Sequence, residues 1–312
     1  MGMMRLQHEK CSFSSYKETV QKVFQMFPPG PKLTEPSPDR CRRCAVVGNS
    51  VNLRGSHYGP LIDFHDVIIR MNKAQIKGYE RDVGTKTTHH VMYPHSATNL
   101  DHSTHLVLFA FKTSDLDWLT KSLTPHGNKK DKNPGLQANK DLVMILNPAF
   151  IQYVHHVWLK KKGMYPSTGF LTLILSLHMC DEVNVFGFGA DRSGNWNHYF
   201  EKLKRKRLKT GHHPGKDEFK DGQNDCWRQR GVSAYPSLGH SVAAGDQCPS
   251  SSEEEEQAGS QAAGWRKPSN SSRVTLSPKR SQQALQRQRG MCSLMLEPCP
   301  FTQKHGPPSL KG

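Results

Sequence analysis

Short, mostly apolar runs alternate with longer stretches of helical spacing through the first part of the chain. The runs are Ala45–Val47, Val67–Ile69, Leu106–Phe111, Leu142–Leu146 and Val183–Phe188. Apolar runs without polar alternation are typical of strands that are buried on both faces of a parallel sheet. Helical spacing predicts helices over residues 150–158, over Thr168–Cys180 and, earlier, over Tyr16–Phe27. The alternation therefore predicts an α/β fold, a mostly parallel sheet with helices on both faces.

The same pattern divides the chain into three parts. Residues 1–40 hold the first helix and a Pro-rich linker, and residues 41–221 hold the α/β domain. Over residues 222–312 the periodicity stops, and Ser, Gln, Pro and a run of four Glu take over. Such a composition buries too little apolar surface to offset the entropy of ordering the chain. This C-terminal tail is therefore predicted to be disordered.

The residues alone do not indicate where in the cell the chain acts. No apolar stretch approaches the roughly 20 residues that a transmembrane helix needs. The N-terminal sequence MGMMRLQHEK is too polar for the apolar part of a signal peptide. An Asn270-Ser271-Ser272 sequon lies in the tail, and it is usable only if the tail enters the secretory lumen.

Two of the predicted strands stop at small or polar residues. The first ends at Gly48-Asn49-Ser50 and the second at Arg70-Met71-Asn72. The carboxyl ends of strands in open α/β sheets are where nucleotides bind, because side chains and free N–H groups gather there. Further on, Tyr165-Pro166-Ser167-Thr168-Gly169 forms a tight turn into an apolar helix, with Ser167 or Thr168 as the N-cap. The N-terminus of that helix could face an anion, although a plain capped helix has the same signature.

Cysteines and histidines carry little information by themselves. Of the eight cysteines, Cys41 and Cys44 form a C-x-x-C sequence, which suits a redox pair or half of a zinc site. No second pair follows it. Cys44 and Cys180, judged from the residues alone, are two buried thiols. Seventeen histidines make any single one weak support for catalysis.

Four segments together resemble the sialyl-motifs of the animal sialyltransferases, in the same order along the chain. Residues 41–90 resemble the long motif, and Tyr165 to Gly189 resembles the short motif. His198-Tyr199-Phe200-Glu201 matches the third motif, and His213 with Glu218 has the spacing of the very short motif, which His212 lacks. The resemblance covers roughly residues 5 to 220 and is closest to the α-2,3-sialyltransferases that act on Galβ1-3GalNAc. It implies a Rossmann-like sheet, a variant of the GT-A glycosyltransferase fold.

The resemblance implies a function and a set of roles. The expected reaction transfers sialic acid from CMP-N-acetylneuraminate, with inversion and without a metal or cofactor, to the 3-hydroxyl of a terminal galactose. The acceptor would be a glycoprotein or glycolipid, and the location the Golgi, with the family's membrane anchor and stem absent from this chain. Histidine has the pKa for proton transfer near neutral pH. The implied residues are His213 as general base and His198 as phosphate stabiliser; Asn49, Asn72, Ser167, Thr168, Gly169 and Gly189 for the donor; Gln7 and Tyr165 for the acceptor; and a Cys44–Cys180 disulfide.

Three departures from the family limit the prediction. Residues 120–140 contain no tyrosine to match an acceptor-binding one, and Cys41 has lost its upstream partner unless Cys11 replaces it. After Glu218, the family's last helix and strand are not recognisable. An inactive variant that keeps only the nucleotide-binding fold is therefore the alternative to an active transferase.

The formal charge of +16 adds one further class. Seven Lys and Arg against one Glu lie between Glu201 and Lys216. Such a cluster suits a solvated face, a nucleic acid or an anionic sugar nucleotide. No nucleic-acid-binding module and no basic–aromatic interleaving accompany it, so charge alone supports a nucleic-acid partner and none is expected.

Overall fold

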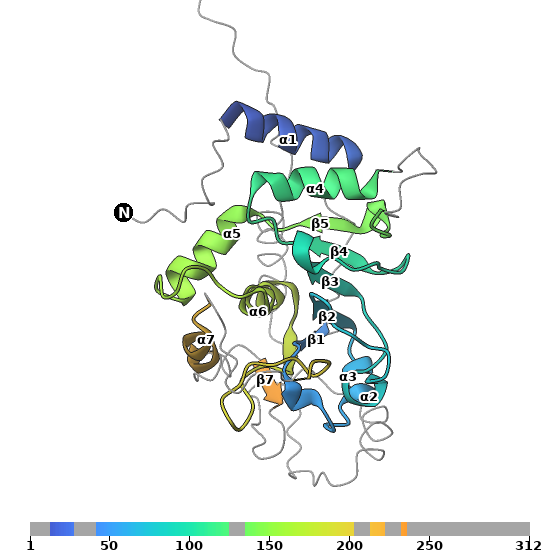
Figure 1. Cartoon of the computed structure of the whole chain (residues 1–312), viewed down its shortest axis with the longest axis vertical. Helices are drawn as coiled ribbons and strands as arrows, with labels where there is room; N and C mark the ends of the chain where they lie inside the picture. Colours follow the sequence, from blue (N-terminus) through green and yellow to red (C-terminus); the bar gives the residue numbers. More distant parts are fainter. Residues whose placement is uncertain (1–12, 28–41, 125–134, 203–212, 222–231, 236–312) are drawn as a thin grey trace, which may run out of the picture.

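A seven-stranded sheet, parallel at every pairing, forms the centre of the protein (Figure 1). The structure is a computed structural model and describes residues 13–27, 42–124, 135–202, 213–221 and 232–235. The strand order is β5-β4-β3-β2-β1-β6-β7. The strands are β1 Arg43–Val47, β2 Val67–Met71, β3 His89–Met92, β4 His105–Leu108, β5 Val143–Ile145, β6 Glu182–Phe186 and β7 Val232–Tyr235. The predicted α/β class is confirmed.

All five predicted strands are present, and two more were missed. The apolar pattern did not predict β3 because its sequence, His89 to Met92, begins with two polar residues, although all four residues are buried. β7 pairs with β6 in a segment that the composition had assigned to the disordered tail, so that prediction is wrong for Val232–Tyr235. Four residues are too short for a composition argument, and pairing with β6 supplies their order. The rest of 222–312 lies outside the described residues.

Helices cover both faces of the sheet. They are α1 Phe13–Met26, α2 Gly59–Asp63, α3 Glu80–Val83, α4 Thr113–Leu123, α5 Pro148–Tyr153, α6 Thr168–Met179 and α7 Gly215–Asp221. The helix predicted over 150–158 is α5 continued by a π-helical turn, Val154–Trp158. Among the described residues, none of the helices has both the length and the apolar character needed to cross a bilayer.

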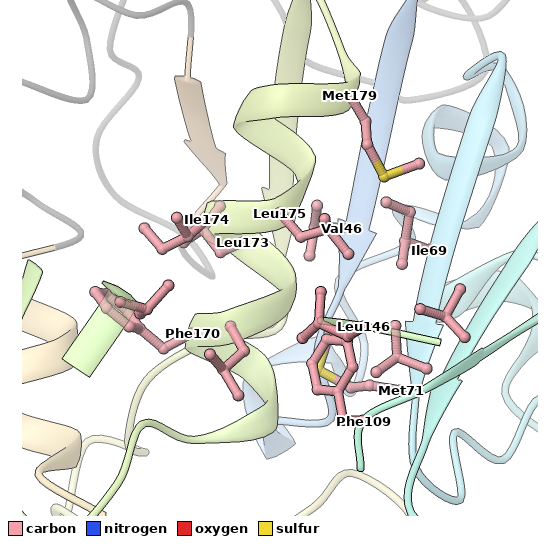
Figure 2. Close-up of a cluster of buried hydrophobic side chains, with 14 of the residues drawn as sticks. Val46, Ile69, Met71, Phe109, Leu146, Phe170, Leu173, Ile174, Leu175 and Met179 are labelled. Carbon is pink, nitrogen blue, oxygen red and sulfur yellow. The ribbon is translucent and has the colours of Figure 1, made fainter. Parts of the chain in front are cut away.

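One face of the sheet packs against α6, as Figure 2 shows. Val46, Ile69 and Met71 point from β1 and β2 toward the helix. From α6, Phe170 and Leu175 belong to the same cluster of buried side chains. Because α6 is covered by the sheet and by α5, it is apolar nearly all round rather than on one stripe.

The opposite face carries two groups of helices. α2 and α3 cover the β1 end, where Ile62 and Val83 meet Ala45. α1 and α4 cover β3 to β5, and the buried Val23 of α1 and Phe27, directly after α1, belong to that cluster. The sequence had set residues 1–40 apart from the α/β domain. The burial of α1 makes it part of the same core.

The disulfide predicted from the resemblance, Cys44–Cys180, is confirmed. It joins the start of β1 to the end of α6, with the two Cα atoms 6.0 Å apart. Arg42 reinforces the junction, since its Nη1 donates to the Met179 carbonyl at 3.0 Å and its backbone N–H donates to Asp181 at 2.9 Å. Helix and strand are therefore fixed at the edge of the sheet where the strands begin.

Candidate active site

The connection order reverses between β1 and β6. Successive strands run from β1 out to β5, and the chain then returns to place β6 on the other side of β1. In open α/β sheets such a switch point is where ligands bind, outside the carboxyl ends of the strands. The sequence-predicted turns at Asn49 and Asn72 follow β1 and β2 at this edge.

Glycines allow the backbone segments after β1 and β6 to approach each other closely at the switch point. Gly48 N–H donates to the Phe186 carbonyl at 2.7 Å. A Cβ on Gly48 would lie 2.4 Å from the Gly187 carbonyl oxygen, and one on Gly169 would lie 3.0 Å from the Phe188 ring. Phe188 thus contacts both glycines, and it brings the ends of β1 and β6 and the start of α6 together.

Ser50 fastens the end of β1 to the segment after β6. Its backbone N–H donates to Gly187 at 2.9 Å, and its hydroxyl donates to the Gly189 carbonyl at 2.8 Å. The neighbouring Asn52 donates to Ala190 at 3.0 Å. Gly189, a predicted donor residue with φ +94°, is therefore held against β1. Sequence reasoning gave Ser50 no role, although its place in the Gly48-Asn49-Ser50 turn was a usable signal.

The two predicted donor asparagines differ in how the fold uses them. Asn49 Nδ2 donates to the Met71 carbonyl at 3.0 Å, so this amide links the ends of β1 and β2. Asn72 has a left-handed backbone, φ +58°, which asparagine tolerates better than most residues. Its Oδ1 is buried and has no hydrogen-bond partner among the residues that the structure describes. An unpartnered buried amide oxygen is costly unless a ligand donor reaches it.

The buried His90 bonds to the backbone of Asn72. His90 Nε2 lies 2.6 Å from the Asn72 carbonyl oxygen, and because a carbonyl only accepts, this nitrogen carries the proton. Burial lowers the pKa of His90; its bond to Asn72 acts in the opposite direction and the nearby Arg70 charge adds to the lowering. His90 is therefore neutral, and it holds the Asn72 backbone through this hydrogen bond. The sequence analysis assigned no role to His90.

His198 lies beside β1 and faces a carboxylate. An isolated antiparallel bridge pairs it with Ser50, and Tyr199 N–H donates to the Asn49 carbonyl at 2.9 Å. Its Nδ1 is 2.9 Å from Glu201 Oε2, and its side chain is 46% exposed. Partial burial acts to raise the pKa of Glu201, but the hydrogen bonds and charge of His198 outweigh it and the pKa is lowered. An ionised Glu201 holds the Nδ1 proton, and Nε2 is left for another partner.

The start of α6 bonds to the carboxyl group of Glu218 and keeps two open N–H donors. Ser167 is the N-cap, accepting the Phe170 N–H at 3.0 Å, and its own N–H donates to Glu218 Oε1 at 2.7 Å. Burial raises the pKa of Glu218 and the bonds from Ser167 act against that rise. Among the described residues, the N–H groups of Thr168 and Gly169 have no acceptor. Those two donors, at the positive end of α6, suit an anionic ligand.

α7 holds His213 against the segment that leads into α6. The His213 ring meets the Tyr165 ring edge-on, with the centroids 4.8 Å apart. Lys162 Nζ bonds to Asp217 at 3.0 Å, and a Cβ on Gly163 would lie 2.6 Å from Pro214. Together with Glu218, these contacts fix His213 beside the predicted acceptor residue Tyr165.

Some predicted residues receive no test here. Gln7, His212, Cys41 and Cys11 lie outside the described residues. In the part of the chain that the structure describes, no three His, Cys, Asp or Glu side chains could hold a metal ion together. The chain has one Asp-x-Asp sequence, a pattern with which many nucleotide-sugar enzymes bind a metal, at Asp115-Leu116-Asp117. Asp115 accepts the N–H groups of Phe111 and Lys112 to cap α4, and Asp117 accepts the Thr19 hydroxyl, so both carboxylates have structural partners.

Comparison with known proteins identifies the family. The chain is 48% identical over 203 residues to CMP-N-acetylneuraminate-beta-galactosamide-alpha-2,3-sialyltransferase 1 of Pan troglodytes. That match covers 64% of this chain and 59% of the relative. It is 50% identical over 187 residues to sialyltransferase 2 of the same series from Mus musculus, covering 59% of this chain and 53% of the relative. The chain thus spans less than two thirds of the length of these relatives.

A solved structure shares the fold. The crystal structure of a mammalian sialyltransferase in complex with Gal-beta-1-3GalNAc-ortho-nitrophenol has a TM-score of 0.63 and 40% identity. The match covers 75% of this chain and 84% of that one. The sequence profile of glycosyltransferase family 29 (sialyltransferase) matches residues 3–224. The chain therefore belongs to glycosyltransferase family 29, the sialyltransferases.

Proposed function

We propose that the chain transfers sialic acid from CMP-N-acetylneuraminate to the 3-hydroxyl of galactose in Galβ1-3GalNAc. The observation that carries this proposal is the convergence of four motif segments on one edge of the sheet. Ser50 joins the end of β1 to Gly189 and to His198, and Glu218 joins α7 to the start of α6. Relatives named alpha-2,3-sialyltransferases and a solved structure containing Gal-beta-1-3GalNAc support the choice of reaction and acceptor.

The proposed chemistry is a direct displacement. The galactose 3-hydroxyl oxygen forms a bond to C2 of sialic acid while the bond from C2 to the CMP phosphate oxygen breaks on the opposite side, which inverts the anomeric centre. The hydroxyl proton passes to His213, the general base, and the bonding pair leaves with CMP. A correctly placed base contributes about 10²–10⁴-fold to such a step. Tyr165 packs against His213 and would place the acceptor next to the base.

The donor is proposed to bind along the switch point. The free Oδ1 of Asn72 would accept a hydrogen bond from CMP, and Asn49 would contribute beside it. The open N–H groups of Thr168 and Gly169, together with the N-cap Ser167 and the Gly189 turn, would surround the phosphate side. His198, with its Nδ1 bound to Glu201, would direct Nε2 to the departing phosphate and stabilise its charge.

The proposal requires no metal and no cofactor. CMP-N-acetylneuraminate has a single phosphate, and protein donors can stabilise the leaving group. We also propose that the chain acts in the Golgi, on glycoprotein or glycolipid acceptors, as its family membership suggests.

A transfer assay tests the reaction. Purified chain is incubated with CMP-N-acetylneuraminate and either Galβ1-3GalNAc or Galβ1-4GlcNAc, with and without EDTA, and the product linkage is read by NMR. The proposal expects an α-2,3 product on the first acceptor at a rate that EDTA leaves unchanged. A chain that binds CMP yet neither transfers nor hydrolyses the donor would instead be the inactive, nucleotide-binding variant.

A further inference from the structure

Three large apolar side chains are exposed together on one short segment. Tyr153, Val157 and Met164 are 39%, 57% and 60% exposed, and no other large apolar side chain in the described ranges is exposed to this degree. Tyr153 and Val157 are four residues apart in continuous helical backbone, so they point to the same side. Scattered exposed apolar residues are ordinary, whereas a group of them marks a contact surface.

Hydrogen bonds fix the turn that joins these residues. His155 Nε2 lies 3.2 Å from the Gly163 carbonyl oxygen. The N–H of Lys161 donates to the His155 carbonyl at 2.8 Å, and that of Lys162 donates to Leu159 at 2.8 Å. The segment that carries Met164 is therefore folded back onto the π-helical turn that carries Val157.

Two cations flank the apolar group. Lys160 and Lys161 are exposed, and within the described residues neither has a carboxylate partner. The next residue, Lys162, is already paired with Asp217. Lysines beside exposed aliphatic and aromatic side chains are the combination that binds the interface of an anionic bilayer, because the apolar groups enter the headgroup region while the ammonium groups meet lipid charge. An acidic protein surface would use the lysines but would not require Val157 and Met164 to stay uncovered.

We propose that Tyr153, Val157, Lys160, Lys161 and Met164 form a membrane-docking surface for anionic lipid. Met164 directly precedes Tyr165, whose ring contacts His213. Docking would therefore bring the acceptor side of the site toward the lipid headgroups, where the sugar of a glycolipid is displayed. That consequence rests on the proposed function, whereas lipid binding itself does not.

Vesicle sedimentation tests the docking surface. The full chain is mixed with vesicles of phosphatidylcholine alone, or with about 30% phosphatidylserine, at physiological salt. The variants are Lys160→Gln/Lys161→Gln and Val157→Ser/Met164→Ser. The matched control is Lys17→Gln/Lys22→Gln on α1, which removes the same charge from another exposed face. Transfer to a soluble disaccharide is measured in parallel.

The expected result is binding to the anionic vesicles that falls about tenfold or more in each docking variant and changes little in the α1 control. Transfer to the soluble disaccharide should stay within about twofold in all of them, so a failure of the transferase proposal would not affect the sedimentation result. Absence of vesicle binding would overturn the proposal. Equal losses in the docking and control lysine variants would also overturn it, because net charge alone would then explain binding. Vesicle binding that stays unchanged in both docking variants would overturn it as well.

Discussion

The two edges of the sheet use the same residue types for opposite purposes. At the edge where the strands begin, His89 and His105 stack with their ring centroids 4.5 Å apart, and the disulfide closes β1 on α6. At the edge where the strands end, His198 is 46% exposed and faces Glu201. Seventeen histidines look equivalent in the sequence, and only the fold shows that His89 and His105 pack together while His198 is open.

Burial explains the difference. Desolvation lowers the pKa of His89 to about 3, and the charges of His105 and Arg42 add to the effect. Burial likewise lowers the pKa of His65. The ring of His65 forms a buried hydrogen bond with the side chain of Asn184. A histidine with a pKa as low as that of His89 is too weak a base to take a proton from a substrate near pH 7. The edge where the strands begin, the structural edge, therefore contributes stability, and the edge where they end, the chemical edge, carries the candidate chemistry.

The strongest test of this comparison replaces His213 with alanine. Loss of a general base should lower kcat by roughly 10²–10⁴-fold and leave CMP affinity nearly unchanged. His198→Ala should slow cleavage of the bond from C2 to the CMP phosphate oxygen, because the departing phosphate loses its stabilising donor. His212→Ala, which lacks the spacing to Glu218, and His102→Ala, exposed near the opposite edge, serve as controls. If all four variants have similar rates, the chemical edge is wrongly assigned.

Removal of the disulfide tests the structural edge. The bond spans a sequence separation of 136 residues, so Cys44→Ser/Cys180→Ser should lower the free energy of unfolding by about 3–5 kcal/mol. Urea unfolding with and without reductant measures the loss, and non-reducing peptide mapping checks the pairing. CMP affinity of the folded fraction should be retained. If neither the substitution nor the reductant changes the unfolding midpoint, the disulfide does not stabilise the protein.

The two asparagines at the chemical edge should respond differently. Asn72→Gly keeps the left-handed backbone and removes the free oxygen, so CMP should bind about 1–3 kcal/mol more weakly with little change in stability. Asn49→Ala should weaken CMP binding and also lower stability, because it breaks the link to Met71. Calorimetry with CMP and thermal unfolding separate the two effects. Unchanged CMP affinity in both variants would reject the donor assignment.

Acid should destabilise the structural edge. The folded-state pKa of His89 is about 3, below its ordinary value of 6.5, so between these values the unfolded chain binds more protons. Stability is therefore complete above pH 6.5 and falls as pH is lowered toward 3. The loss from this group is about 2 kcal/mol at pH 5. His89→Gln should flatten the dependence measured by urea unfolding at pH 7.5 and 5, and an equally steep dependence in the variant would show that other groups cause it.

The smallest expected effect concerns Glu218, which we expect to position His213 by bonding to the Ser167 N–H. Glu218→Gln retains an oxygen to accept the Ser167 N–H, so its kcat should stay within about threefold of wild type. Glu218→Ala should lose about tenfold in kcat with a smaller change in KM, since α7 would no longer be held to the start of α6. A glutamine variant as slow as the alanine variant would mean that the carboxylate charge, rather than the hydrogen bond, is required.

The sequence by itself determined the features that depend on near neighbours along the chain. Apolar runs predicted five of the seven strands, because a buried strand leaves an unbroken local signature. The turns at Asn49 and Asn72 and an N-cap at Ser167 or Thr168 were also predictable, since caps and turns are set by one or two residues. The structure selects Ser167. The resemblance to the sialyl-motifs supplied the candidate residues and the disulfide pairing.

Only the tertiary structure decided the rest, because each remaining feature depends on residues far apart in sequence. β3 is a strand because its neighbours bury its two histidines, and β7 because it pairs with β6. The links from Ser50 to Gly189 and from Ser167 to Glu218 join residues 139 and 51 positions apart. Local pattern cannot report such contacts. The burial of His89 and the exposure of His198 likewise follow from how the layers pack.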